Sequence, residues 1–244
     1  MSGQGRYYFA SDLHLGPDSD PGGVRERAFA EYLETLPDDI AGLYLLGDIF
    51  DFWVDYRDVV PRGGVRVLAA LAKVAERTDV WFYPGNHDWW VTDYFEKELG
   101  VTIVPDPWTV LEIEGRRICI GHGDAPGASD FRSRLTFRLF RSRFLIALLR
   151  SLHPRLPFAL ARSWTASSRS KHDKYVRKLG RQVEDTGIYK FADAFGRKLA
   201  EEGKPGIDLY IFGHIHTPAR VPVSSGGELI ILGDWSDGPS YFCL

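Results

Sequence analysis

Five short apolar runs in this sequence each end in a cluster of Gly, Asp, Asn and His, and this pattern constrains the fold more than any other feature. The runs are Tyr7–Ala10, Leu43–Leu46, Val80–Tyr83, Arg117–Ile120 and Leu209–Phe212. A short apolar run that stops at a polar turn is typical of a buried strand, and strand ends at one sheet edge are where α/β folds build sites. The sequence therefore predicts an α/β protein in which several strand ends share one polar site.

The clusters offer the ligand types that hard divalent metals need, namely carboxylate, imidazole and amide groups. They are Asp12-Leu13-His14, Gly47-Asp48-Ile49-Phe50-Asp51, Gly85-Asn86-His87-Asp88, Gly121-His122-Gly123-Asp124 and Gly213-His214-Ile215-His216. Their glycines let the backbone turn sharply. A single cluster of this kind is more often a turn, a helix cap or a packed histidine. Five in this order, each directly after an apolar run, predict a metal centre.

The remaining chain is interpreted as further strands and helices. Helical spacing occurs over 24–36, 65–75 and 188–202, whereas Val101–Val104, Trp108–Ile113 and Arg117–Ile120 are expected to be adjacent strands. Three more strands are expected at Arg220–Val223, Leu229–Leu232 and Tyr241–Cys243. We expect residues 1–127 and 182–244 to form one catalytic domain, and 128–181 to be a helical insertion.

The charge of the chain is unevenly distributed. Residues 128–181 contain 14 Lys and Arg and two acids, whereas the other 190 residues contain 16 bases and 31 acids. Such asymmetry fits nucleic acid, an anionic membrane or a phosphorylated ligand, with a solvated helical face as the plain alternative. Apolar side chains alternate with arginines over Phe131–Leu152, as in helices that lie on membranes, although packing against the body would produce the same stripe.

Composition excludes several other classes. The two cysteines, Cys119 and Cys243, cannot build a disulfide framework, and no apolar run reaches 18 residues. We therefore expect a cytoplasmic protein. Neither cysteine lies in a cluster and no G-x-S-x-G motif is present. A metal centre of the kind that the clusters predict can activate water, so no protein nucleophile is required.

The ordered motifs D-x-H, G-D-x-x-D, G-N-H-D, G-H and G-H-x-H resemble those of the calcineurin-like metallophosphoesterase superfamily. This resemblance implies a two-layer β-sandwich flanked by helices, with a dinuclear centre. Two cations about 3.5–4 Å apart can activate water and clamp the oxygens of an in-line displacement at phosphorus, so the resemblance implies attack by a metal-bridging hydroxide. By position in the motifs, one metal ion would be held by Asp12, His14, Asp48 and His216. Asp48 would bridge to a second ion, held also by Asn86, His122 and His214. Catalysis would fall to His87 and Asp48, and His87 would not ligate metal.

Asp51 lies three positions past Asp48 and Asp88 two positions past Asn86, and we expect them to orient those ligands. An exposed or helix-capping acid is the alternative for both. In a second arm of the insertion, Arg169, Lys171 and Lys174 stand among serines and suit a pyrophosphate or phosphosugar. The expected substrate-binding residues are Asn86, His87, Asp130, Arg169, Lys171, Lys174 and His214.

Longer aromatic motifs narrow the resemblance. Gly47 to Trp53, Pro84 to Trp90 and the insertion after the fourth motif look like the UDP-2,3-diacylglucosamine pyrophosphatase family of lipid A biosynthesis. That family releases UMP and 2,3-diacylglucosamine 1-phosphate (lipid X). One position departs from it, because the well-known branch has Arg where this chain has His87. A phosphodiesterase or phosphatase for a soluble nucleotide, or a scaffold without catalysis, are the alternatives.

The same resemblance implies partners and cofactors. We expect two divalent ions, Mn²⁺ first, with Fe, Zn and Co left open by the ligand set. The expected partners are a lipid-linked UDP-sugar and an anionic membrane, with the protein bound peripherally on the cytoplasmic face of the inner membrane. Nucleic acid is not expected. The acyl-chain length and the oligomeric state stay open.

Overall fold

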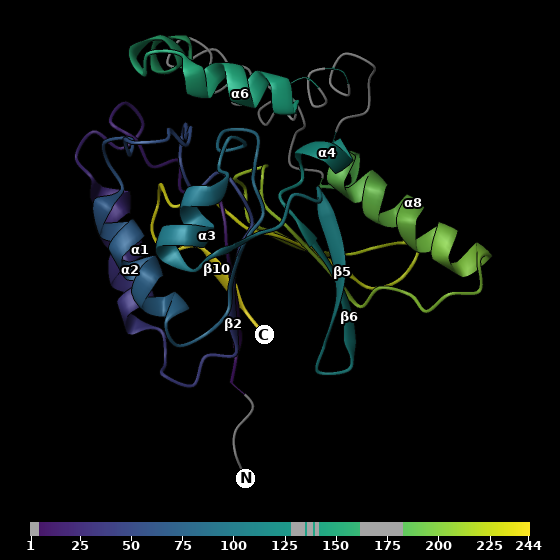
Figure 1. Ribbon diagram of the computed structural model, residues 1–244. Helices are drawn as coiled ribbons and strands as arrows, with labels where there is room; N and C mark the ends of the chain where they lie inside the picture. Colours follow the sequence, from purple (N-terminus) through teal and green to yellow (C-terminus); the bar gives the residue numbers. More distant parts are fainter. Residues whose placement is uncertain (1–4, 128–134, 136–138, 140–141, 162–182) are drawn as a thin grey trace.

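The computed structural model describes residues 5–127, 135, 139, 142–161 and 183–244, and contains two five-stranded sheets packed face to face (Figure 1). The first sheet has the order β10-β1-β2-β3-β4, with β1 Tyr7–Ala10, β2 Gly42–Leu45, β3 Val80–Phe82, β4 Thr102–Ile103 and β10 Tyr241–Cys243. The second has the order β5-β6-β7-β9-β8, with β5 Trp108–Ile113, β6 Arg116–Gly121, β7 Leu209–Phe212, β8 Ala219–Pro222 and β9 Glu228–Ile231. The expected β-sandwich is confirmed.

Helices cover the outer face of each sheet. The helices over the first sheet are α1 Val24–Thr35, α2 Val65–Ala75 and α3 Asp93–Leu99, and α8 Gly187–Glu201 packs on the second. The alternation of side chains along β1 shows the layering, because Tyr8 and Ala10 join the core under the helices while Phe9 joins the core between the sheets. The molecule therefore has four layers and three apolar cores.

The parallel strands bring the polar clusters to one edge. Strands β1, β2 and β3 run parallel in the first sheet, and β6, β7 and β9 run parallel in the second. The backbone amide of Asp12 donates to the carbonyl of Gly47, and that of Gly213 donates to the carbonyl of His122. These bonds join the turns that follow neighbouring strands, so residues far apart in sequence meet at the carboxyl ends of both sheets.

One helix in this part of the fold was not predicted, and one expected strand was assigned to the wrong neighbour. The residues after β3 include a helix, α3, that we did not expect, and Phe95 and Leu99 are its buried side chains. The strand expected at Val101–Val104 does not lie beside β5. Its core, β4, pairs in parallel with β3 in the other sheet, because α3 provides the crossover that a parallel connection needs.

The described part of the insertion is helical. Helix α6, Arg143–Ser151, crosses the end of the molecule at which the clusters gather (Figure 1), and a second helix covers Arg155–Ala161. Short elements flank the insertion, namely α4 Asp124–Gly127 and the 3₁₀ helix Val183–Asp185. Within the described ranges no single helix is long and apolar enough to cross a membrane. Phe144–Ser151 and Arg155–Ala161 pass the length and composition test together, but they are bent by 119°.

Candidate dinuclear metal site

The turns that follow the strands place their polar side chains in unusual backbone conformations. Six residues other than glycine have positive φ in the described part of the chain, and five of them are expected metal ligands. These are Asp12, His14, Asp48, His214 and His216, with φ between 48° and 72°. Left-handed conformations cost about 1–3 kcal/mol in residues with a side chain and persist where the surroundings fix them. Their concentration at one edge marks the site.

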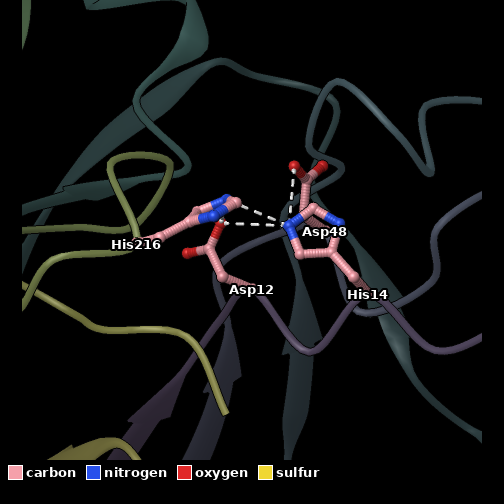
Figure 2. Close-up of side chains that lie close together, drawn as sticks. All are labelled: Asp12, His14, Asp48 and His216. Atoms are coloured by element: carbon pink, nitrogen blue, oxygen red, sulfur yellow. Dashed lines mark hydrogen bonds and ion pairs between the residues drawn. The ribbon is translucent and has the colours of Figure 1, made fainter. Parts of the chain in front are cut away.

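One group of ligands forms around Asp12 and His14 (Figure 2). The Nε2 atoms of His14 and His216 lie 3.0 Å apart. Nε2 of His216 is 3.4 Å from Oδ1 of Asp12, and Nε2 of His14 is 3.8 Å from Oδ2 of Asp48. One ligand atom from each of these four residues lies within 4.8 Å of every other, so the expected first ligand set converges.

A second group shares Asp48. Oδ2 of Asp48 is 3.3 Å from Nε2 of His122, and the latter is 3.3 Å from Nδ1 of His214 and 3.2 Å from Oδ1 of Asn86. Asp48, His122 and His214 again lie within 4.8 Å of one another. The glycine before Asn86 is required here, because a Cβ on Gly85 would stand 2.2 Å from Oδ1 of Asp48. The structure thus brings all seven expected ligands into two groups joined by Asp48.

The chemistry of these donors fits two divalent cations. Oδ1 of Asp12 is buried without a hydrogen-bond partner in the described structure, although a buried carboxylate normally has one. Burial alone would raise the pKa of Asp12, but His216 and the charge of His122 outweigh it and lower the pKa to about 2. Burial also opposes the ionisation of Asp48, yet His122 and His87 hold its pKa well below the usual value. Both carboxylates are therefore anionic ligands at neutral pH.

The histidines divide into two kinds in the metal-free protein. Burial lowers the pKa of His14 well below its usual value, and burial together with the charge of His122 lowers the pKa of His214 to about 3. Burial acts in the same direction on His122, but Asp48 and Asp12 outweigh it and raise its pKa well above the usual value. His14 and His214 are thus neutral donors, whereas His122 carries a proton that a metal ion would have to displace.

Asp88 holds the backbone under the bridging carboxylate. Its two oxygens accept hydrogen bonds from the backbone amides of Gly85, Asp48, Ile49 and Phe50 at 2.7–3.2 Å. Burial and the nearby charge of Asp48 raise the pKa of Asp88 to about 7, against the effect of these amides. The carboxylate ties the turn after β3 to the turn after β2.

His87 and Asp51 lie beside the first group. Nδ1 of His87 is 3.0 Å from the carbonyl oxygen of Asp51 and 3.6 Å from its Oδ1, and Oδ1 is also 3.8 Å from Nδ1 of His14. The rings of His87 and His14 meet edge to face at 4.8 Å. His14, Asp51 and His87 also satisfy the spacing of a metal-binding group. Oδ1 of Asp51 thus lies within 4 Å of both rings, and its orienting role stays a prediction.

An apolar cleft opens next to Asp51. Its lining includes Leu15, Phe50, Phe52, Trp53 and Pro61 of the body and Phe158 and Ala161 of the insertion. The rings of Phe52 and Phe158 meet edge to face at 5.0 Å. The insertion therefore contributes part of the lining of a cleft that also includes Asp51.

Some expected substrate residues lie outside the described part of the chain, namely Asp130, Arg169, Lys171 and Lys174. Conversely, the five motifs did not include Asp234, whose Oδ2 lies 3.8 Å from Nδ1 of His216. A signal for it was present, because Gly233-Asp234 follows the apolar run Leu229–Leu232 just as Gly47-Asp48 follows Leu43–Leu46. The sequence pattern therefore has a sixth member, because Asp234 also follows the end of an apolar run.

The fold and the donor set define a class of protein. A sequence profile of the calcineurin-like phosphoesterases matches residues 5–218, and the chain belongs to that family of metal-dependent hydrolases. It is 35% identical over 250 residues to the UDP-2,3-diacylglucosamine hydrolase of Porphyromonas gingivalis, covering 97% of this chain and 92% of the relative. The enzyme of the same name from Xanthomonas oryzae is 31% identical, with 97% and 94% covered, and that of Shewanella piezotolerans is 26% identical, with 98% and 94% covered.

Proposed function

We propose that this protein hydrolyses the pyrophosphate of UDP-2,3-diacylglucosamine, with water as the second reactant and UMP and 2,3-diacylglucosamine 1-phosphate as products, a step of lipid A biosynthesis. The observation that carries the proposal is the near full-length similarity to enzymes of that name. The apolar cleft beside Asp51 supports it, because a diacylated sugar needs an apolar surface close to the reacting phosphate.

The residues divide the work of this reaction among them. Two bound divalent ions would supply Lewis acidity and activate water, held by the two groups that share Asp48. His87 is 5% exposed and its Nδ1 faces the carbonyl of Asp51. Its imidazole would stabilise charge on the reacting phosphate or donate a proton to the leaving oxygen. The apolar cleft would receive acyl chains, at about 0.8 kcal/mol for each buried methylene.

The test is UMP release from UDP-2,3-diacylglucosamine, compared with UDP-GlcNAc and a small chromogenic phosphodiester. We expect the acylated substrate to be preferred over UDP-GlcNAc by at least about 100-fold in kcat/KM, which corresponds to roughly 2.7 kcal/mol. Phe158→Ser should reduce hydrolysis of the acylated substrate while sparing the small diester. Equal rates on UDP-GlcNAc would favour the soluble-nucleotide alternative instead.

We further propose that the protein binds the surface of an anionic membrane, on the cytoplasmic face of the inner membrane. Eleven large apolar side chains are exposed in the described part of the chain, and six lie on the insertion. These are Leu135, Leu139, Phe144, Leu148, Leu156 and Leu160. Phe144 and Leu148 stand one helical turn apart on α6, and Phe144 is 78% exposed. An apolar helix face accompanied by basic residues suits insertion at the head-group level.

Co-sedimentation with vesicles tests this association. Phe144→Glu combined with Leu148→Glu should weaken binding to vesicles that contain anionic lipid. Tyr241→Glu is a matched control, because Tyr241 is 47% exposed on β10, against 44% for Leu148. If both variants bind vesicles as the wild-type protein does, the membrane proposal is wrong, whatever the substrate.

A further inference from the structure

The imidazole of His216 lies between two carboxylates. Its Nε2 faces the first ligand group, 3.4 Å from Oδ1 of Asp12, and its Nδ1 faces Oδ2 of Asp234 at 3.8 Å. A neutral imidazole that ligates through Nε2 must carry its proton on Nδ1. The group that faces Nδ1 therefore determines whether His216 presents a free electron pair to a metal ion.

Asp234 is itself held firmly in place. Its backbone amide donates to the carbonyl of His216 at 3.2 Å, which joins the turn after β9 to the turn after β7. The amide and hydroxyl of Ser236 donate to the two carboxylate oxygens at 3.2 and 3.1 Å. The next residue, Trp235, is 2% exposed and packs edge to face against Phe29 at 5.0 Å. The carboxylate thus sits on an anchored loop.

We propose that Asp234 is a positioning residue that fixes the tautomer and the orientation of His216 for the first metal ion. The inference rests on the proposed dinuclear site but not on any substrate. His122 provides a parallel within the same site, because its Nδ1 is 2.8 Å from the carbonyl oxygen of Leu46 while its Nε2 faces Asp48. For His216, whose side chain is 24% exposed, the partner is a charged group at the solvent-facing rim.

The test is a titration of the metal-free protein with Mn²⁺, with free Mn²⁺ counted by electron paramagnetic resonance. The reference variants His216→Ala and His214→Ala show which binding step belongs to each ligand group. We expect Asp234→Ala to weaken the step that His216→Ala weakens, by about 10–100-fold in Kd, and to leave the other step unchanged. Asp234→Asn, which keeps the shape but not the charge, should have a smaller effect on the same step.

Two controls separate positioning from general damage. Asp237→Asn changes an exposed acid on the same loop and should bind both ions with wild-type affinity. Adding Asp234→Ala to His216→Ala should cause no further loss, because a residue that acts through His216 has nothing left to position. The inference is overturned if Asp234→Ala binds both ions as the wild type does, if it weakens both steps equally, or if the two substitutions are additive. Failure to hydrolyse UDP-2,3-diacylglucosamine would leave these metal measurements unaffected.

Discussion

Asp48 belongs to both ligand groups, so its substitution affects two ions at once. We expect Asp48→Ala to lose both metals and at least about 100-fold in activity, since even the outer partners of metal ligands contribute about 10–100-fold. Metal content measured on the purified variant checks this. Asp55→Ala removes another buried aspartate, one that accepts bonds from Trp53 and Thr92, and should lower stability but retain two ions. Two ions retained in Asp48→Ala would contradict a bridging role.

His87 lies next to an expected ligand but has contacts of its own with Asp51. His87→Ala should retain both metal ions and lose about 10²–10⁴-fold in kcat, the usual contribution of a positioned acid or charge stabiliser. Steady-state kinetics on the small diester, together with metal content, distinguishes this from a ligand. Loss of one ion in step with activity would instead assign His87 to the group that includes His14 and Asp51.

At the level of single residues, the sequence alone was enough to predict the seven candidate ligands but not Asp234. The seven expected ligands meet because each follows one of the strands. Those strands can be recognised in the sequence as short apolar runs. Asp234 was missed because it has no histidine beside it, and Gly-Asp after a strand is common in ordinary turns. The contact with His216 depends on the pairing of β7 with β9, which no local pattern reveals.

At the level of elements, Arg150 on α6 joins the insertion to the body. Its Nη2 is 3.2 Å from Oδ1 of Asp93, the first residue of α3. Such partly exposed pairs contribute about 0.2–1 kcal/mol, too little to change global unfolding noticeably. Arg150→Ala should therefore leave the melting temperature nearly unchanged while amide hydrogen exchange in α6 becomes faster. Arg155→Ala serves as the comparison, and equal exchange in wild type and Arg150→Ala would mean that the pair does not hold α6.

Elements were predicted well where they were long or strictly periodic. Helix α3 was missed although Phe95 and Leu99 have helical spacing, because a helix of seven residues gives only one such repeat. The strand β4 has two residues and was assigned to the wrong neighbour, since sequence proximity to β5 says nothing about which sheet a strand joins. The sheet that a short strand joins is decided by tertiary packing, and the sequence of the strand itself does not reveal it.

For the whole molecule, the histidines predict how the stability of the metal-free protein depends on pH. Neighbouring carboxylates raise the pKa values of His122 and His216. The stability that their protonated forms give the folded protein is therefore lost as the pH rises above about 6.5, the ordinary pKa of histidine. The pKa values of His14 and His214 are lowered, so below that pH the unfolded chain binds protons that the folded chain does not, and stability falls again. Asp88, whose pKa is raised to about 7, also holds a proton in the folded chain that the unfolded chain has lost, so the metal-free protein should be most stable slightly below pH 6.5.

Melting temperatures of chelated and Mn²⁺-loaded samples, measured from about pH 5 to about pH 9, check this profile. In the loaded protein the fall above the maximum should disappear, because a cation takes the place of the proton that His122 loses. A chelated sample whose stability keeps rising up to the highest pH would contradict the assignment of a protonated His122.

At the five ligands with a left-handed backbone, a substitution that increases the stability of the protein would remove a metal ligand and so reduce activity. Glycine adopts positive φ without strain, so a glycine at position 14 or 216 would relieve about 1 kcal/mol that alanine would not, while removing the imidazole. A laboratory selection for heat resistance alone would therefore erode this centre, and a selection for turnover would restore the strain. A thermostable natural relative that remains active has to gain its stability elsewhere in the fold.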